Sequence, residues 1–371
     1  MKFENPIYVT QTLLPNLDAV KDILEDVWRS HRLSNHNAKE QLLERFIKDY
    51  LKVEYASLFN NGTVALIIAI QSLRLSGEII TSAFDFPASP HAITWNKIKP
   101  VFCDIKEDTL NIDVNKIEEL ITQQTTAILP VHVFGTPCNV TKIKEIADTY
   151  GLRVIYDAAH AFGAEINGVG IGNYGDVSMF SFHATKLFHT AEGGALTVNS
   201  ENLKKQIYLL KNFGIKNEDE VILPGINGKM SEIHAAIGLA VLPLVEDEIN
   251  KRKKLRELYI ENMESIEEIE FIRIPKNVKS NYPYFVIKIK NPLSRDFIYQ
   301  ELKKYNIFAR KYFYPLCSNY PCYKQQNINQ DLKVAEKIVT QTLALPFYGE
   351  LGEDSVVRIC NIIKKIIGKN L

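Results

Sequence analysis

Between about Leu51 and Ser200, short runs of apolar and β-branched residues alternate with longer segments in which apolar residues recur at helical spacing. The short runs have the length of strands and are bounded by Gly, Asp, Asn or Thr, which is typical of β-strands. The predicted strands are Glu78–Thr81, Pro100–Asp104, Ala127–Val131, Arg153–Tyr156, Val177–Phe182 and Ala195–Val198. Strands that alternate with helices form a mostly parallel sheet, so the pattern predicts an α/β fold.

Two segments, Val64–Leu75 and Ser231–Leu242, are apolar at nearly every position and are predicted to be helices buried on most sides. After Val245 the composition changes to a charged helix, EDEINKRKKLRELYIENM, whose charged side chains are expected to face solvent.

The remaining chain predicts a half-buried strand and two helices, at Tyr282–Lys290, Arg295–Tyr305 and from Asp354 onward. We therefore expect a large domain over residues 1–245, with an N-terminal arm over 1–50. A small C-terminal α+β domain is expected over residues 246–371.

Composition narrows the class of protein. Of 371 residues, 46% are hydrophobic, and 44 basic residues balance 44 acidic ones. No overall charge would attract nucleic acid or a membrane surface. The first ten residues lack the signal-peptide pattern and no apolar run approaches the roughly 20 residues that span a bilayer, so we expect a cytoplasmic protein. The five cysteines lack CxxC spacing, which predicts reduced thiols, mostly in the core, and no metal site.

Two charged residues follow predicted strands at the sheet edge where ligands bind in open α/β folds. Lys186 follows Val177–Phe182 and is either a surface charge or a buried nucleophile with a lowered pKa. Asp157 follows Arg153–Tyr156 and is either a helix cap or a partner for the ring nitrogen of pyridoxal 5′-phosphate (PLP).

Asn61-Gly62-Thr63 precedes the apolar helix. It is either a simple N-cap or a phosphate site built from free N–H groups at the positive end of the helix dipole. Gly170–Gly175 matches GxGxxG, but it precedes a strand instead of following one, so a hairpin or loop is expected there and not a dinucleotide site.

Five motifs occur in order along the chain: NGTVAL, DAAHAFG, SFHATK, EGGA and GINGKMSEIHAAIGL. Together they resemble the DegT-type sugar aminotransferases of PLP fold type I, over roughly Val9 to Phe347. The resemblance implies a large PLP-binding domain with a small C-terminal domain, and PLP as cofactor with a pyridoxamine 5′-phosphate form as intermediate.

The resemblance also implies the role of each site residue. Lys186 would carry the cofactor as a Schiff base and act as the general acid and base. Asp157 would pair with the pyridinium, and His160, where many relatives have Gln, would bond the phenolate oxygen. The implied phosphate ligands are Gly62, Thr63, Ser181 and, from the partner subunit of an obligate homodimer with shared active sites, Asn227. Phe86 is implied to stack on the ring, with an ordinary core position as the alternative.

Substrate contacts are implied for Asn35, His183, Arg310 and Tyr312, although Arg310 could equally be a solvated cation. The closest branch acts on dTDP-4-keto-6-deoxyglucose, with L-glutamate as amino donor, and its product would enter a bacterial surface glycan such as O-antigen. Amination at C3 is the first alternative. A sugar dehydratase is disfavoured because those relatives replace the lysine with histidine, and a regulator without turnover is disfavoured by the complete lysine, Asp and phosphate set.

Overall fold

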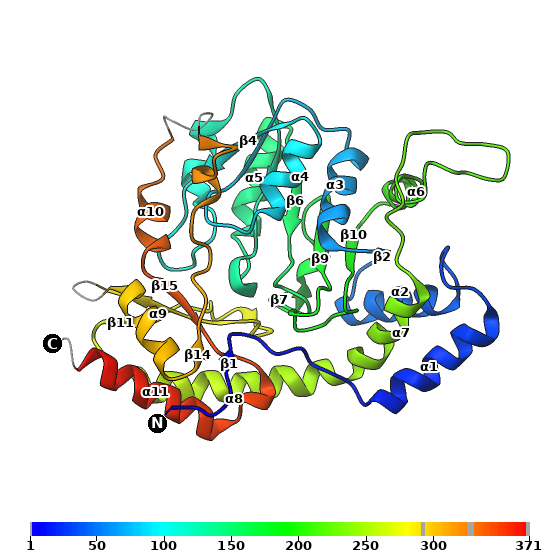
Figure 1. Cartoon of the computed structure of the whole chain (residues 1–371). Coiled ribbons are helices and arrows are strands. Elements are labelled where there is room, and N and C mark those ends of the chain that lie inside the picture. The colour runs from blue at the N-terminus through cyan, green and yellow to red at the C-terminus, as the bar shows by residue number, and fades with distance from the viewer. Residues whose placement is uncertain (1, 291–293, 325–329, 369–371) are drawn as a thin grey trace.

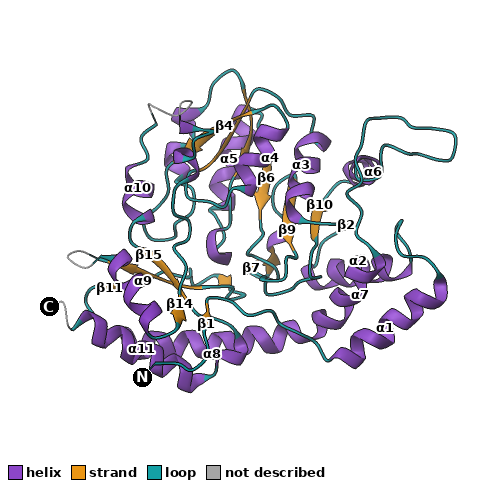
Figure 2. Ribbon diagram, viewed as in Figure 1, coloured by secondary structure: helices purple, strands orange, loops and turns teal. Residues whose placement is uncertain are grey.

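The computed structural model describes residues 2–290, 294–324 and 330–368. Within them a seven-stranded sheet lies between helices, and a smaller layered unit packs below it in the view of Figures 1 and 2. The strands of the large sheet are, in spatial order, β2 (Tyr55–Phe59), β10 (Gly194–Val198), β9 (Val177–Ser181), β6 (Arg153–Asp157), β5 (Thr125–Leu129), β3 (Glu78–Ser82) and β4 (Lys99–Cys103). Neighbours from β9 to β4 are parallel, whereas β10 is antiparallel to β9 and β2. The predicted α/β fold and its mostly parallel sheet are confirmed, and each strand predicted for this sheet lies within two residues of its expected bounds.

Each face of this sheet is covered by helices because successive strand residues point to opposite sides. Ile79 packs into a core with helices on one face, and its neighbour Ile80 packs into the core on the other. The first face carries α3 (Gly62–Ser72), α4 (Ala88–Trp95) and α6 (Glu201–Leu210). The second carries α2 (Ala38–Leu51), α5 (Val140–Tyr150) and α7 (Glu232–Val241), with α1 (Leu17–Ser30) against α7.

The two predicted buried helices, α3 and α7, are confirmed with capped N-termini. The Asn61 side chain accepts from the Val64 N–H at 2.8 Å, so α3 begins at Gly62, two residues before the prediction. Ser231 accepts from the His234 N–H and is the cap of α7 instead of its first residue. In both cases a polar side chain replaces the missing intrahelical partner of the first turn.

The smaller unit is built on a three-stranded antiparallel sheet that packs against helices. Its elements are α8 (Val245–Met263), β11 (Ile269–Phe271), β13 (Phe285–Ile289), α9 (Arg295–Lys304), β14 (Ile307–Phe308), α10 (Lys333–Val339), β15 (Thr342–Leu345) and α11 (Glu353–Ile367). The N-terminal strand β1 (Ile7–Tyr8) pairs in parallel with β14, and Phe3 belongs to the core of this unit. The expected division of the chain near residue 245 remains a prediction, because α8 contributes to the core on each side of it.

The segment with the GxGxxG pattern is a turn that opens no α-helix: Gly170 is the last residue of a hairpin, and the 3₁₀ helix η4 (Ile171–Asn173) follows that hairpin. The hairpin is made of β7 (Glu165–Ile166) and β8 (Val169–Gly170), with β12 (Val278–Lys279) beside β7. Cys103, Cys138, Cys317 and Cys360 are buried free thiols and Cys322 is exposed, which confirms the expectation of mostly core cysteines. Across the described ranges, we find no helix whose length and apolar character would let it cross a bilayer.

Two expectations about charged side chains were wrong. The prediction that the charges of α8 face solvent fails at Glu248 and Arg252, which are 3% and 2% exposed and form a 2.6 Å ion pair. Glu248 also accepts from the Gly349 N–H, and Arg252 donates to the Pro283 carbonyl, so each charge is satisfied inside the protein. The strand β13 is buried along its whole length instead of half-buried, since Lys288 extends to the Glu107 carbonyl and forms an ion pair with Glu270.

We predict that Glu248→Ala destabilises the fold by about 3–5 kcal/mol, because it leaves the Arg252 guanidinium buried without its counter-ion. The matched control is Asp247→Ala, which breaks the exposed pair with Lys251 at the same i, i+4 spacing on the same helix. That change should cost no more than about 0.5 kcal/mol. Urea unfolding of both variants measures the difference, and equal losses would contradict the structural role of the buried pair.

Candidate active site

A cavity of about 310 Å³ opens at the carboxyl ends of β3, β6 and β9. The carboxyl ends of parallel strands meet at one edge of a sheet, and loops there are free to carry ligand-binding groups. All of the predicted site residues except Asn35 and Asn227 line it: Gly62, Thr63, Phe86, Asp157, His160, Ser181, His183, Lys186, Arg310 and Tyr312. Residues that are distant in the sequence are thus gathered in one place.

Lys186 lies in the turn after β9 and is half-buried. Its backbone N–H donates to the His183 carbonyl at 2.8 Å, which fixes the turn. Burial lowers the pKa of its amine, and the carboxylate of Asp157 opposes that shift only in part. A larger fraction of Lys186 is therefore neutral near pH 7 than of an exposed lysine, as a nucleophile requires.

Asp157 ends β6 and is 4% exposed. Its Oδ2 accepts from the Ser89 hydroxyl at 2.7 Å, and its Oδ1 accepts from the Ala159 N–H at 2.9 Å. Burial raises the pKa of this carboxyl above its usual range, and the bonds from Ser89 and Ala159 and the charge of Lys186 oppose that rise only in part. Each oxygen thus has a donor, an arrangement that favours the carboxylate form.

The N-terminus of α3 forms a small concave surface beside the end of β9. The first N–H groups of a helix have no partner within it, and the helix dipole favours an anion there. A Cβ on Gly62 would lie 3.2 Å from the Ser181 Cβ, and a Cβ on Gly194 would lie 2.8 Å from Gly62. Glycine at position 194 therefore allows the backbone to approach α3 closely, and a side chain at position 62 would crowd Ser181. The Ser181 hydroxyl and Thr63 border the space that remains.

His160 and Phe86 present rings to the cavity. His160 lies 4.9 Å from the Tyr284 ring in an edge-on arrangement, and its Nδ1 is buried without a hydrogen-bond partner among the described residues. Burial, with a contribution from Lys186, holds the pKa of His160 well below its usual range, so the imidazole is neutral. Phe86 is 57% exposed and is not an ordinary core aromatic. Both rings thus border space in the cavity that a ligand can occupy.

At the mouth of the cavity lie His183, Arg310 and Tyr312. The His183 Nδ1 is 2.9 Å from the Thr185 hydroxyl, and its Nε2 is 3.6 Å from Glu192. The Arg310 guanidinium lies 5.5 Å from the Tyr312 ring centroid, and the Arg310 backbone pairs with Ala344, which holds the segment against β15. Arg310 and Tyr312 come from the smaller unit, so the site is enclosed from both parts of the molecule.

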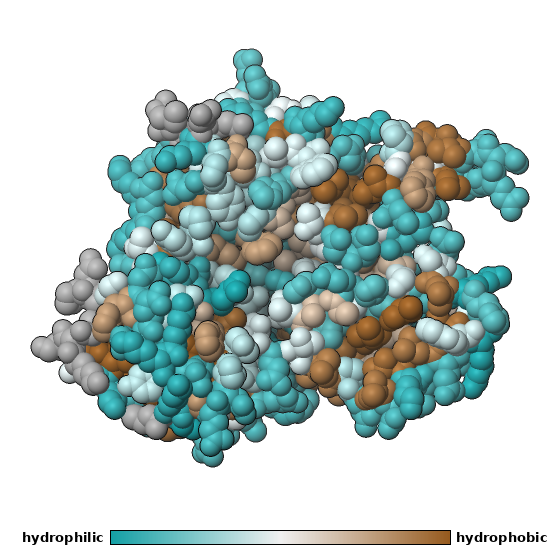
Figure 3. Space-filling view, viewed as in Figure 1, coloured by the Kyte–Doolittle hydropathy of each residue, from teal (hydrophilic) through white to brown (hydrophobic). Residues whose placement is uncertain are grey.

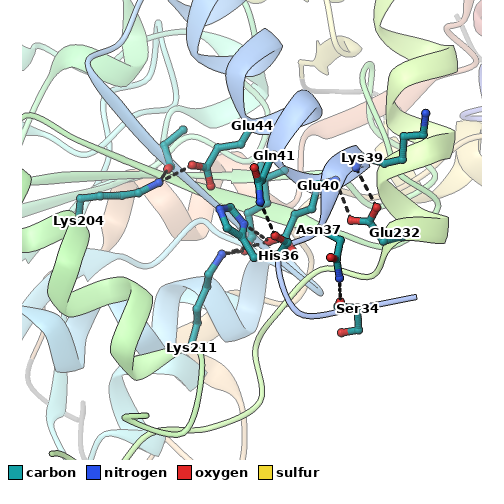
Figure 4. A network of polar contacts seen from close by, with 12 residues as sticks. Ser34, His36, Asn37, Lys39, Glu40, Gln41, Glu44, Lys204, Lys211 and Glu232 are labelled. Carbon is teal, nitrogen blue, oxygen red and sulfur yellow. Dashed lines mark hydrogen bonds and ion pairs between the residues drawn. The ribbon is translucent and has the colours of Figure 1, made fainter. Parts of the chain in front are cut away.

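Asn35 and Asn227 are exposed and do not line the cavity of their own chain. The loop before α2 is held by the polar network of Figure 4, where His36 and Lys211 approach Glu40 at 3.4 and 3.2 Å. Burial would raise the pKa of Glu40, but His36 and Lys211 lower it overall. Asn227 lies on the chain that returns to the sheet after a projecting loop, paired with Asn212.

Sequence reasoning missed three residues of the site: Asp85, Ser89 and Tyr284, all buried or half-buried at the cavity or next to it. The FDFPAS run after β3 carries a polar residue on each side of Phe86 and could have indicated the first two. Tyr284 precedes a strand far along the chain, and no local signal joins it to this edge.

Other features carry no comparable chemistry. A cavity of about 370 Å³ lies between the Lys106–Ile112 loop and Pro275–Val278, and it contains none of the predicted site residues. In the part of the chain that the structure describes, no three His, Cys, Asp or Glu side chains are placed to hold a metal ion together.

The chain is similar to known aminotransferases over nearly its whole length. The profile of the DegT/DnrJ/EryC1/StrS aminotransferase family matches residues 17–364. The chain is 44% identical to the dTDP-4-amino-4,6-dideoxy-D-glucose transaminase of Shigella dysenteriae over 366 residues, covering 98% of this chain and 100% of that protein. It is also 44% identical to the Escherichia coli transaminase of the same name, covering 97% and 98% of the two chains.

Solved structures agree with the sequence comparison. The structure of DesI in the presence of its TDP-sugar product superposes with a TM-score of 0.94 at 30% identity, covering 98% of this chain and 93% of that one. The structure of PseC from Helicobacter pylori, an aminotransferase involved in the biosynthesis of pseudoaminic acid, gives a TM-score of 0.93 at 27% identity, covering 98% and 100%.

We predict that Ser181→Ala weakens binding of a phosphate-bearing ligand about 10- to 100-fold, the effect of losing one hydroxyl donor to a charged group. The control is Ser178→Ala on the same strand, whose hydroxyl donates to the Tyr174 carbonyl and lies outside the cavity lining. It should leave the affinity unchanged. Titration of each variant with PLP measures both constants, and equal affinities in the two variants would remove Ser181 from the phosphate site.

Proposed function

Because the chain belongs to the DegT/DnrJ/EryC1/StrS aminotransferase family, we propose that it transfers an amino group from L-glutamate to C4 of dTDP-4-keto-6-deoxyglucose, forming dTDP-4-amino-4,6-dideoxyglucose. Aminotransferases of this family depend on PLP. One observation carries the proposal: a half-buried lysine, a buried carboxylate and the N-terminus of α3 share one cavity. The names of the two 44% identical relatives favour C4 over C3, and Lys186 disfavours a dehydratase.

The cavity fits PLP by its own chemistry. The cofactor has an anionic phosphate, a ring nitrogen that must hold a proton, a phenolate oxygen and an aromatic face. The cavity offers a helix N-terminus with Ser181, the twice-bonded carboxylate of Asp157, an unpaired nitrogen on His160, and the exposed ring of Phe86. Each part of the cofactor therefore has a partner among the described side chains.

PLP supplies the electron sink that stabilises negative charge at a substrate carbon. In the proposed mechanism, Asp157 holds the proton on the ring nitrogen, because its two donors keep it ionised in a buried place. Phe86 and Tyr312 would exclude water from the cavity that they line. His160, held neutral by burial, can donate one N–H toward the phenolate oxygen without adding a positive charge.

Lys186 has two tasks in the proposal. Its neutral amine would be the covalent attachment point for the cofactor, and as a free side chain it would take a proton from the amino-bearing carbon of the donor and give a proton to C4 of the sugar. Attachment and proton abstraction need the unprotonated amine, which burial favours, whereas proton donation needs the ammonium form that abstraction produces. At the mouth of the cavity, Arg310 would meet the glutamate carboxylate or the sugar diphosphate, with His183 beside it.

The active enzyme is proposed to be a homodimer whose subunits complete each other's sites. Figure 3 shows brown apolar side chains gathering over α6 with the loop that follows it and over α1 with α7. The exposed apolar residues of these regions are Leu14, Leu17, Trp28, Leu33, Phe213, Ile215, Val221, Ile222 and Ile226. An apolar face of this kind marks a contact surface. Burial of this loop against a second copy would carry Asn227 to the phosphate of the partner, and Asn35 to its cavity mouth. A cytoplasmic location belongs to the same proposal, as does a role in surface-glycan synthesis, which rests on the family resemblance.

We predict that Lys186→Arg lowers the rate of amino transfer by at least about 1,000-fold, because arginine keeps the charge but cannot supply a neutral amine at working pH. The test follows the visible absorbance of the bound cofactor. In the wild-type enzyme, L-glutamate should bleach the band and dTDP-4-keto-6-deoxyglucose should restore it, and neither change should occur in the variant. If glutamate leaves the wild-type band untouched, the aminotransferase proposal fails. If glutamate bleaches it but only a 3-keto sugar restores it, amination occurs at C3.

Shared active sites predict complementation between two inactive proteins. When Lys186→Ala and Asn227→Asp subunits are mixed and allowed to exchange, half of the dimers should be mixed, and each should have one intact site. Activity should therefore recover to about a quarter of the wild-type value per subunit. No recovery after subunit exchange, verified by native mass spectrometry, would show that Asn227 serves the site of its own chain.

A further inference from the structure

The buried carboxyl of Asp85 has no role in the function proposed above. Asp85 follows β3, immediately before Phe86, and is 2% exposed on the wall of the cavity. Its Oδ1 accepts from the Phe86 N–H at 2.6 Å. Its Oδ2 is buried and has no hydrogen-bond partner within the described ranges. A bare oxygen in such a place is costly for a carboxylate, which attracts donors to both oxygens.

Asp104 shows how this protein surrounds an aspartate with partners at similar burial. It is 1% exposed, and its oxygens accept from the N–H groups of Ile105, Val334 and Ala335. Lys116 adds an ion pair at 3.0 Å. Of these four kinds of contact, the Asp85 carboxyl has only the counterpart of the first within the described ranges, the hydrogen bond from the N–H of the next residue. The comparison indicates that Asp85 is not built to hold a full negative charge.

The surroundings of Asp85 lead to the same conclusion. Its carboxyl interacts electrostatically with Asp157 and Lys186, and the Ser89 hydroxyl that donates to Asp157 also interacts with Asp85, although no hydrogen bond of standard geometry joins the two. Two carboxyls in one buried site do not both ionise readily. The other titratable groups that face Asp85 are the Cys138 and Cys317 thiols and the Tyr320 phenol, and burial raises the pKa of each, so they remain neutral.

We propose that Asp85 is a protonated carboxylic acid in the working enzyme, and that Asp85, Ser89 and Asp157 together hold a single negative charge beside the ring nitrogen of the cofactor. The negative charge lies on Asp157, whose two oxygens accept hydrogen bonds from the Ser89 hydroxyl and the Ala159 N–H, and the proton is bound to Asp85. Burial and the charge of Asp157 raise the pKa of Asp85 well above its usual range, in agreement with this assignment.

Asp85 is thus a positioning residue, and its neutrality has two effects. A second carboxylate would compete for the proton on the ring nitrogen that Asp157 must hold in place. It would also stabilise the ammonium form of Lys186 and reduce the fraction of neutral amine. This role rests on the proposed function, whereas the protonation state of Asp85 is a property of the chain and can be tested without turnover.

The test compares the thermal stability of wild type and Asp85→Asn, as purified, between pH 5 and pH 8.5. In the unfolded chain Asp85 loses its proton above about pH 4, whereas the native protein must retain it, so wild type loses stability relative to a neutral residue as pH rises. Asp85→Asn should therefore melt roughly 2–5 °C above wild type at pH 8, and the gain should shrink toward pH 5. Asp104→Asn is the matched control and should melt below wild type throughout.

A difference in melting temperature between Asp85→Asn and wild type that does not grow with pH would overturn the assignment of the proton to Asp85. If Asp85→Asn melts below wild type by an amount independent of pH, as expected for Asp104→Asn, then Asp85 is ionised in the native state. Asp85→Thr, which is also neutral but smaller, covers the case in which asparagine does not fold, because the slope of the difference with pH is diagnostic even when the variant is less stable overall.

A second readout addresses the role toward the cofactor. Asp85→Asn should bind PLP within about threefold of wild type at pH 7.5, since an uncharged group replaces an uncharged group. Asp157→Asn should weaken binding at least about tenfold. If the two variants bind PLP equally well while the thermal stability depends on pH as expected, Asp85 is protonated but has no role toward the cofactor ring. Absence of PLP binding in wild type would refute the proposed function alone.

Discussion

Lys186 and Asp157 share a cavity, and the function proposed for them needs a neutral amine and a charged carboxyl. Burial disfavours charge on both groups, so the same low-polarity surroundings help the lysine and oppose the aspartate. The protein reduces the conflict locally, by aiming the Ser89 hydroxyl and the Ala159 N–H at the carboxylate, whereas the charge of Asp157 offsets the effect of burial on the amine only in part. Both groups follow neighbouring strands of one sheet, so the order of those strands is what brings them together.

The walls of the cavity depend on contacts between the two layered units. Tyr284, Arg310 and Tyr312 come from the smaller unit, and they can face Lys186 only if that unit is held in place. Asp104 caps the N-terminus of α10, Lys288 extends from β13 to the Glu107 carbonyl, and the Glu248–Arg252 pair ties α8 to the chain at Pro283 and Gly349. Buried charges with several partners have strict geometry, so they fix the relative position of the parts they join.

Much of the fold could be predicted from the sequence because its signals are local. The strands β3 to β6 are short and apolar on both faces, and α3 and α7 are apolar helices with a cap residue beside them. The strand β2 was not predicted, although it lies at the edge of the same sheet. Lys186, Asp157 and Gly62 could be proposed because each follows or precedes such an element within a motif. Asp85, Tyr284 and the buried pair on α8 could not, since burial of a polar residue depends on partners such as Asp157, Pro283 and Gly349 that lie tens to more than a hundred positions away.

The pairing of β1 with β14 affects how the protein folds during its synthesis. Phe3 packs in the same core as the isoleucines of α11, and Arg358 on that helix donates to the Lys2 carbonyl, so this core joins residues that lie 356 positions apart in the sequence. During synthesis the first residues leave the ribosome long before the last helix exists. The large sheet can form while translation continues, but the first residues must wait exposed until the final helix emerges to cover them.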